Sequence, residues 1–339
     1  MLHRYLTYLF FLLLVACSPD PQPVVQEHVS IVGSVLEIQG GREFSQISDS
    51  LYHQGLIYVA EGSDASVLAL SPDGEIIHQF AGKGQGPGEL QSASSLDGQG
   101  NHLYVFDDEA YQLSIFQNNG EFVRNLKLNF PGHPRFGVDA QHRIYFSNPT
   151  QPSPITVIDN QGQIVRRFGE NQPWLHYRAD QTHAQWKMLF AVDDRIIAVS
   201  ECKPFIEVYG QDGELRSFIS LEEHPSMTQK LTAVRNLFEE QPKRKQRTVI
   251  LVFEDATLSG NELYLLAWSR WRGPSNLVLV FDVSTDTPKF VREFELNRQT
   301  PDLRGLSASS FCRYADGDLY VFGSETSQLF RFPLGAGIN

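Results

Sequence analysis

The amino-acid sequence predicts an all-β protein, a six-bladed β-propeller made of four-stranded antiparallel blades with one helical insertion. Three observations predict it. One strand-to-turn unit recurs along the chain, each copy holds four short strand-like segments, and the last copy lacks its fourth strand. A unit copied at nearly constant spacing is typical of propellers and other repeat folds.

The repeated unit is an apolar strand core followed by a turn that contains glycine. From Tyr58 to Gly74 the spacing is 16 residues, and from Tyr104 to Gly120 it is again 16. Two further strand cores are followed by such a turn, Ile144–Phe146 by Gln161-Gly162 and Ile196–Ala198 by Asp212-Gly213. The strand core recurs twice more, at Glu262–Leu266 and Leu319–Phe322. These copies of the strand core predict six blades.

Each copy divides into four strands, as the second one illustrates. Its segments 92–97, 102–107, 112–117 and 121–128 are rich in β-branched and aromatic residues and are bounded by glycine, asparagine and aspartate. Asn119-Gly120 is a strong signal for a tight hairpin between the last two segments, because both residues tolerate positive φ.

The two ends of the chain complement each other. The last copy has strands near 307–314, 319–323 and 328–333, and no segment remains for a fourth. The β-rich segment His28–Ile38 precedes the first copy and belongs to none. We therefore expect this N-terminal strand to complete the last blade and close the ring, which removes the exposed sheet edges of an open array.

The first residues are typical of an export signal. Arg4 precedes the apolar stretch Leu6–Val15, which is too short to span a bilayer. Leu14-Val15-Ala16-Cys17 resembles the bacterial lipobox, which implies that Cys17 becomes a lipidated N-terminus. The alternative is an ordinary secretory signal cut near Ala16. We expect a signal peptide at 1–16, a lipidated tether at 17–27 and the propeller at 28–339.

The location follows from the same segment. Ser18 after the cysteine resembles the sorting pattern for the outer membrane, so we expect an exported, lipid-anchored protein of the bacterial cell envelope. The tether holds several prolines and few apolar residues, which is typical of a linker.

Two insertions interrupt the repeats. Within 222–247, the residues Leu231, Val234, Leu237 and Phe238 follow helical spacing, which predicts an amphipathic helix over 227–240. The basic run 243–247 after it fits either a solvated surface or a patch for an anionic partner. The second insertion, 170–185, is rich in aromatic and polar residues.

Composition excludes some functions. The formal net charge is −12, which argues against nucleic-acid binding because such proteins need a positive field. No G-x-S-x-G, H-E-x-x-H, phosphate-binding loop or C-x-x-C pattern occurs. We expect Cys202 and Cys312 to be separate thiols rather than a disulfide, because they fall at non-equivalent places in different repeats.

The linker Gly82–Leu90, with the sequence GKGQGPGEL, resembles the glycine-rich linker of NHL-repeat propellers. Leu103–Val105 and Leu113–Phe116 resemble that family's second and third strands. The Asn-His-Leu signature is not kept, since Ala110–Leu113 stands in its place. Together with the lipobox, the chain resembles bacterial six-bladed propeller lipoproteins. The resemblance implies fold and location and carries no activity.

Candidate ligand-binding residues lie in the loops that follow each second and fourth strand, which share one face of a propeller. These loops combine tryptophan with arginine, the residue types that binding hot spots favour. Arginine can hold a carboxylate, and tryptophan offers a flat surface to a sugar or an aromatic group. The candidates are Arg135, Trp174, Tyr177, Arg178, Trp186, Trp268, Arg270, Trp271 and Arg272. The alternative is that Trp174 and Trp186 fill a gap beside the insertion and the arginines pair with local acids.

An enzyme is the other hypothesis. Some six-bladed relatives in this resemblance are metal-dependent lactonases or lyases with their site at the mouth of the channel. His133, His176 and His183 could converge there as a zinc site. The recurring aspartates Asp97, Asp139, Asp193 and Asp255 fit turn capping better than a metal site. We expect a monomeric binding protein without catalytic activity or cofactor, anchored in the membrane through Cys17, with an unknown ligand or envelope protein as its partner.

Overall fold

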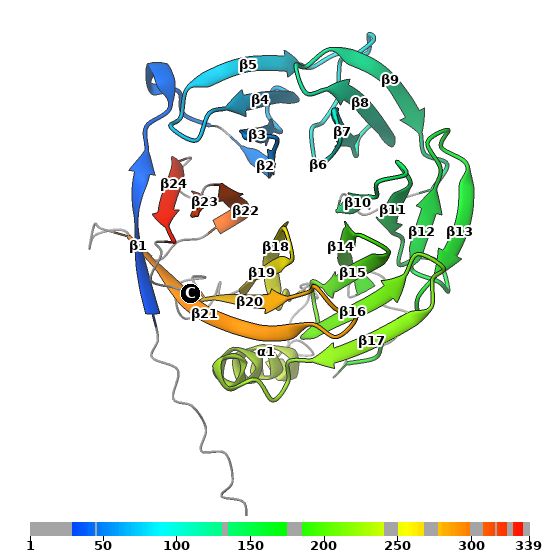
Figure 1. Cartoon of the computed structure of the whole chain (residues 1–339), viewed down its shortest axis with the longest axis vertical. Helices are drawn as coiled ribbons and strands as arrows, with labels where there is room; N and C mark the ends of the chain where they lie inside the picture. The colour runs from blue at the N-terminus through cyan, green and yellow to red at the C-terminus, as the bar shows by residue number, and fades with distance from the viewer. Residues whose placement is uncertain are drawn as a thin grey trace, which may run out of the picture.

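A computed structural model describes residues 29–44, 46–130, 135–174, 185–240, 250–267, 277–298, 308–315, 317–323 and 328–334. The chain forms an all-β propeller, with its sheets arranged as a ring around a common centre and one α-helix on the outside of the described part (Figure 1).

Four sheets have four strands each, consecutive in sequence and antiparallel. The first two are β2 (Ile47–His53), β3 (Leu56–Glu61), β4 (Ser66–Leu70) and β5 (Ile76–Ala81), then β6 (Ser95–Gln99), β7 (His102–Asp107), β8 (Gln112–Gln117) and β9 (Phe122–Lys127). The next two are β10 (Phe136–Val138), β11 (Ile144–Ser147), β12 (Ile155–Ile158) and β13 (Ile164–Phe168), then β14 (Lys187–Val192), β15 (Arg195–Ser200), β16 (Phe205–Gly210) and β17 (Leu215–Ser220).

The remaining strands form one eight-stranded sheet in the order β18-β19-β20-β21-β1-β24-β23-β22. Its strands are β1 (Val29–Leu36), β18 (Phe253–Ser259), β19 (Glu262–Ala267), β20 (Leu277–Asp282), β21 (Lys289–Arg298), β22 (Ala308–Ala315), β23 (Asp318–Gly323) and β24 (Gln328–Pro333).

The prediction of six separate four-stranded blades is wrong. The ring contains four four-stranded sheets and this single large sheet, because β1 pairs on both sides. Ser34–Leu36 runs antiparallel to β24, while Val29–Gly33 runs parallel to β21. Strand β1 thus provides hydrogen-bonding partners for two sheet edges and joins the last two sets of strands into one sheet. The sequence pattern of β1 shows only that it is a strand.

Burial follows the place of each strand in its sheet. The second strands are buried on both faces, as in β3 and β15, because neighbouring sheets cover both faces. The fourth strands alternate, as in β5 and β9, because one face meets solvent. The core therefore lies between adjacent sheets, where Phe80 of one meets Phe116 of the next with ring centroids 5.0 Å apart.

The recurring glycine serves two purposes. Gly120 and Gly213 have φ of 84° and 85°, in the left-handed region that favours glycine. A Cβ on Gly120 would also lie 2.9 Å from Phe80 of the preceding sheet, and one on Gly213 would lie 2.8 Å from Phe168. The turn therefore sits against the neighbouring sheet, which explains why the spacing recurs.

The predicted helix is present. A 3-10 turn, η3 (Pro225–Met227), leads into α1 (Thr228–Glu240) on the outside of the ring (Figure 1). Met227, Leu231 and Val234 are buried in the cluster that also holds Phe253. The basic run 243–247 lies outside the described residues. A short 3-10 turn, η1 (Gln39–Gly41), follows β1. No helix among the described residues is long and apolar enough to cross a membrane.

Candidate functional site

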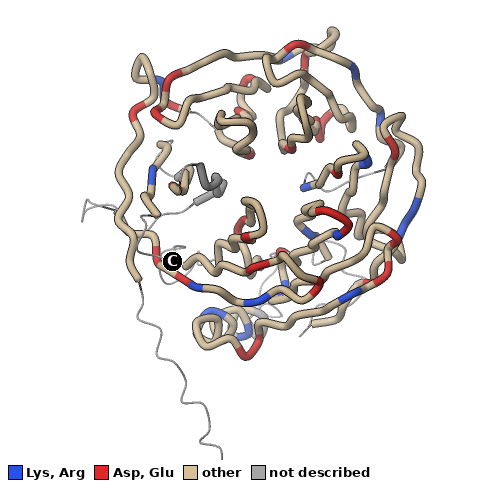
Figure 2. The backbone as a smooth tube through the Cα atoms, in the orientation of Figure 1, with Lys and Arg blue, Asp and Glu red and all other residues tan. Residues whose placement is uncertain are grey.

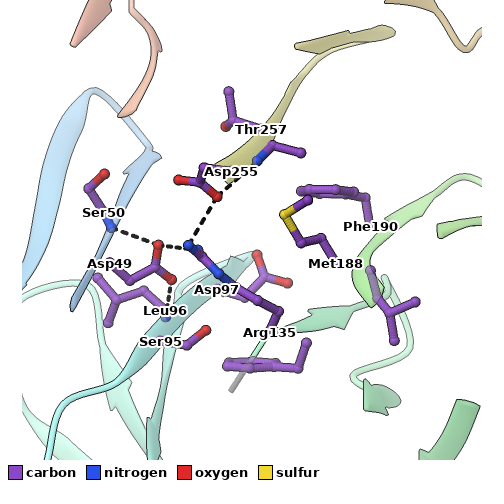
Figure 3. Close-up of a pocket in the computed structure, with 13 residues that line it drawn as sticks. Asp49, Ser50, Ser95, Leu96, Asp97, Arg135, Met188, Phe190, Asp255 and Thr257 are labelled. Atoms are coloured by element: carbon purple, nitrogen blue, oxygen red, sulfur yellow. Dashed lines mark hydrogen bonds and ion pairs between the residues drawn. The ribbon is translucent and has the colours of Figure 1, made fainter. Parts of the chain in front are cut away.

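A polar cavity of about 40 Å³ lies where the innermost strands of five strand sets approach one another. A water molecule needs roughly 10–15 Å³ counted in this way, so the cavity has room for a few. The lining residues are Asp49, Ser50, Ser95, Leu96, Asp97, Arg135, Phe136, Met188, Leu189, Phe190, Asp255, Ala256 and Thr257 (Figure 3).

Arg135 immediately precedes β10 and extends between two aspartates of other sheets. Its Nη1 lies 2.6 Å from Oδ1 of Asp49 on β2, and its Nη2 lies 3.0 Å from Oδ1 of Asp255 on β18 (Figure 3). Burial opposes the charge, but Asp255, Asp49 and Glu201 outweigh it and raise the pKa of Arg135 above its ordinary value. The guanidinium is therefore a permanent charge that joins three inner strands.

The aspartates connect neighbouring inner strands through the backbone. Asp49 Oδ2 accepts a 2.8 Å hydrogen bond from the Leu96 amide on β6. Asp97 on β6 repeats the arrangement, because its Oδ2 accepts a 2.7 Å bond from the Val138 amide on β10. Carboxylates that accept backbone N–H groups are held in one orientation, so these side chains are rigid parts of the cavity wall.

Turn capping explains the positions of only some of the recurring aspartates. Asp139 caps its turn, with Oδ1 accepting bonds from the amides of Gln141 and Arg143 at 2.9 Å each. Asp193 lies in the equivalent turn after β14 and pairs with Arg195. Asp97 and Asp255 instead lie inside their strands and line the cavity, so for these two the expectation of a turn cap is wrong.

Thr257 on β18 supplies a hydroxyl that has no hydrogen-bonding partner among the described residues. The residue is 2% exposed, and its Oγ1 makes no hydrogen bond to any described residue. A buried hydroxyl left without a partner costs about 1–3 kcal/mol. Thr257 forms part of the cavity wall, while its Oγ1 is itself covered by protein atoms.

Glu201, after β15, lies within electrostatic range of the cavity. Burial raises the pKa of its carboxyl to about 7, with Arg135 lowering it and Asp255 and Glu254 raising it further. Glu201 is 8% exposed. A group beside the cavity thus changes charge near neutral pH.

A separate buried network lies beside β14. Lys187 pairs with Glu207, and Lys203 donates to the carbonyl of Gln172 and to Oε1 of Gln185. Burial, helped by Lys187, lowers the pKa of Lys203 to about 8. Neither lysine lines the cavity, and their partners lie within the scaffold.

Only some candidate residues fall within the described part of the chain. Arg135 lines the cavity. Trp174 is 5% exposed, and its Nε1 donates a 2.8 Å bond to Oε1 of Glu222. Trp186 is partly buried, and its backbone carbonyl accepts a hydrogen bond from the Glu201 amide. The candidates outside the described residues are Cys17, His133, His176, Tyr177, Arg178, His183, Trp268, Arg270, Trp271 and Arg272.

Sequence reasoning missed most of the cavity. Asp49, Met188, Phe190 and Thr257 belong to innermost strands and resemble ordinary strand residues. One signal was available, because Asp49, Asp97 and Asp255 each occupy the third position of an innermost strand. An acidic residue recurring inside a strand, rather than after it, points to the centre of the ring.

Within the described ranges, no group of three or more His, Cys, Asp or Glu side chains is arranged to hold a metal ion. Cys202 is buried and is not part of a disulfide.

Comparison with known proteins identifies the fold alone. No family model and no curated protein matches the sequence. A protein of Bacteroides fragilis that is named as exported superimposes with a TM-score of 0.59 at 12% identity, over 89% of this chain and 94% of its own. A Bacteroides thetaiotaomicron protein of unknown function gives 0.54 at 10% identity, over 90% and 73%. Streptogramin B lyase gives 0.50 at 11% identity, over 90% and 98%.

Proposed function

We propose that this chain is an exported binding protein that holds a small ligand in the cavity around Arg135. The observation that carries the proposal is the cavity itself, which is polar and is lined from five inner strands. A few convergent polar groups in a preformed recess are the usual form of a small-molecule site.

The arrangement of the charged groups favours binding over catalysis. The Arg135 guanidinium is engaged by Asp49 and Asp255. Each of these aspartates also accepts a hydrogen bond from the backbone amide of the residue that follows it. Side chains held in this way determine the shape and the charge of a binding site. A catalytic acid or nucleophile, in contrast, must be able to transfer a proton or to form a bond with the substrate. A metal-dependent enzyme is the alternative, and stoichiometric zinc or calcium in the purified protein, lost together with an activity, would favour it.

Attachment to the envelope through a lipid on Cys17 belongs to the same proposal. It rests on Leu14-Val15-Ala16-Cys17, and the fold likeness to a protein named as exported is consistent with it. An outer-membrane location rests on Ser18. The test is metabolic labelling with a palmitate analogue, in which wild type takes up label and Cys17→Ser does not. Label retained by Cys17→Ser would contradict the anchor.

Methionine-methyl NMR tests the binding site directly. The chain has three methionines, of which Met188 lines the cavity and Met227 is buried beside α1. We would label the methionine methyl groups of full-length Cys17→Ser protein with ¹³C and titrate n-butylammonium, butyrate, 1-butanol and glucose. The expected result is a saturable shift of Met188 with at least one compound, while Met227 stays in place. If no compound moves Met188, or both signals move together, the cavity is not a ligand site.

A further inference from the structure

We infer that a second recess, formed by the turns of two neighbouring sheets, binds an acidic oligosaccharide. The inference does not depend on the cavity around Arg135, with which this recess shares no lining residue. It follows from the polar side chains that line the recess and from two arginines beside it that have no acidic partner among the described residues.

The recess is open to solvent and has a volume of about 400 Å³. Binding sites for small molecules have volumes of roughly 300–1,000 Å³. Gln141 and Arg143 contribute from the β10–β11 side, Asp159 and Asn160 from the turn between β12 and β13, and Gln211 from the turn between β16 and β17. The site therefore lies across the junction of two sheets.

Two arginines are held beside this recess by its own backbone. Arg124 on β9 donates a 2.5 Å hydrogen bond from Nη2 to the carbonyl of Asn160, and Arg166 on β13 donates a 3.0 Å bond from Nη1 to the carbonyl of Gln211. Figure 2 shows basic segments along the outer strands at the right of the ring, where Figure 1 places β9 and β13. Each guanidinium is thus fixed next to a residue of the recess wall.

Neither of these arginines makes an ion pair with an acidic side chain of the described residues. Arg216 on β17, which also reaches the following sheet, differs because it pairs with the carboxylate of Asp286 at 3.2 Å. A guanidinium has five N–H donors, and one bond to a carbonyl leaves most of them available. Arg124 and Arg166 can therefore bind anionic groups of a ligand, with the bidentate geometry that arginine favours.

The wall between the arginines suits hydroxyl groups. The side-chain amides of Gln141, Asn160 and Gln211 can each donate and accept hydrogen bonds, as a sugar hydroxyl does. The two charged lining residues are already engaged, because Asp159 accepts two backbone amides at 2.9 Å each and Arg143 pairs with Asp139 at 2.7 Å. Amides between two available guanidinium groups match a ligand that carries both hydroxyls and acid groups.

The first experiment compares three compounds by isothermal titration calorimetry with the full-length Cys17→Ser protein at constant ionic strength. Trigalacturonate carries sugar hydroxyls and carboxylates, maltotriose carries the hydroxyls alone, and tripolyphosphate carries the charge alone. Trigalacturonate should bind saturably and about tenfold more tightly than either control, because only it uses both the arginines and the amides.

The other outcomes of this comparison each contradict the inference. Tripolyphosphate binding as tightly as trigalacturonate would show a site for charge alone, and equally tight maltotriose would show that the acid groups are not recognised. Absence of trigalacturonate binding would overturn the site. The Met188 methyl signal should stay in place during this titration, because Met188 lines the cavity and not the recess. A saturable shift of Met188 would place the ligand in the cavity instead.

The second experiment uses two neighbouring arginines that differ in their relation to the recess. Arg166 and Arg167 are both exposed on β13, but successive strand residues point to opposite faces, and only Arg166 donates to the recess wall. Arg166→Gln should weaken trigalacturonate binding about tenfold, because a charged hydrogen-bond donor is lost. Arg167→Gln removes the same charge and should leave the affinity unchanged.

The same comparison applies to Arg124→Gln, with Lys127→Gln on β9 as its matched control. Thermal unfolding should show that all four variants fold, since the replaced side chains are not part of the core. Equal losses in Arg166→Gln and Arg167→Gln would indicate unspecific attraction between charges. Wild-type affinity in both Arg166→Gln and Arg124→Gln would overturn the assignment of the recess.

Discussion

At the scale of single residues, the centre of the ring is defined by a few charged groups whose states depend on burial. Arg135 keeps its charge because two aspartates surround it. Glu201 lies near the same charges with its pKa raised to about 7, so its carboxylate is unfavourable in the folded protein. The same burial that shapes the cavity therefore lowers stability when Glu201 ionises.

We expect Glu201→Gln to stabilise the protein at alkaline pH and not at acid pH. The carboxyl has a pKa of 4.5 in the unfolded chain and about 7 when folded. The folded state therefore binds more protons between these values, and stability falls as pH rises from 4.5 through 7. The gain in unfolding free energy should be near zero at pH 4.5 and reach up to about 3 kcal/mol at pH 8.

Urea unfolding at several pH values measures this difference. Glu214→Gln, at an exposed position, is the matched control and should show no pH-dependent change. A Glu201→Gln effect of the same size at both ends of the range would contradict the raised pKa.

At the scale of elements, the sheets are joined to one another by side chains that cross from one to the next. Arg166 on β13 donates to the backbone carbonyl of Gln211, in a turn of the next sheet. Arg216 on β17 donates to the side-chain carboxylate of Asp286, which lies between β20 and β21. The start of the helical insertion is held by a different contact. Trp174, before β14, packs edge-on to Phe205 and binds Glu222 at the start of the helical insertion.

We expect Trp174→Ala to destabilise the protein by about 3–5 kcal/mol, because a large buried side chain leaves a void. Trp174→Phe should cost less, since it keeps most of the packing while it loses the bond to Glu222. Thermal unfolding measures both. In Trp174→Phe, a compound that shifts Met188 in the wild type should still do so with wild-type affinity. Loss of that binding in a stable variant would instead make Trp174 part of the ligand site.

At the scale of the whole molecule, β1 joins the two ends of the chain. Ile31 is buried in a cluster with Phe294 of β21 and Phe332 of β24. Gly33 lies against the same cluster, and a Cβ there would come within 2.5 Å of the Phe332 ring. This ring is fully buried and cannot move aside easily. The junction of the eight-stranded sheet therefore depends on close packing at one glycine.

We expect Gly33→Ala to lower the unfolding free energy by about 1–3 kcal/mol through overpacking against Phe332. Ser34→Ala, at the next and exposed position, makes no such contact and should be nearly neutral. Denaturant unfolding measures the stability, and limited proteolysis should release the N-terminal strand faster in Gly33→Ala. Equal stability of the two variants would show that the sheet yields at this point.

Much of the fold could be predicted because its signals are local. The strand cores follow from alternating and apolar segments, and the turn at Gly120 follows from a backbone conformation that glycine adopts most readily. Helix α1 follows from the spacing of Leu231 and Val234, which pack inward as that spacing requires. Each of these signals lies within a few residues of the structure it specifies.

The number of separate sheets and the cavity depend on tertiary structure instead. A strand pattern contains no information on how many edges the strand will pair with, and β1 pairs with partners almost 300 residues away. Asp49 and Asp255 are more than 200 residues apart, yet ring closure brings both to Arg135. The local sequence therefore specifies the strands and turns. The pairing of β1 with two sheet edges and the meeting of the aspartates with Arg135 arise only when residues far apart in the chain are brought together in the ring.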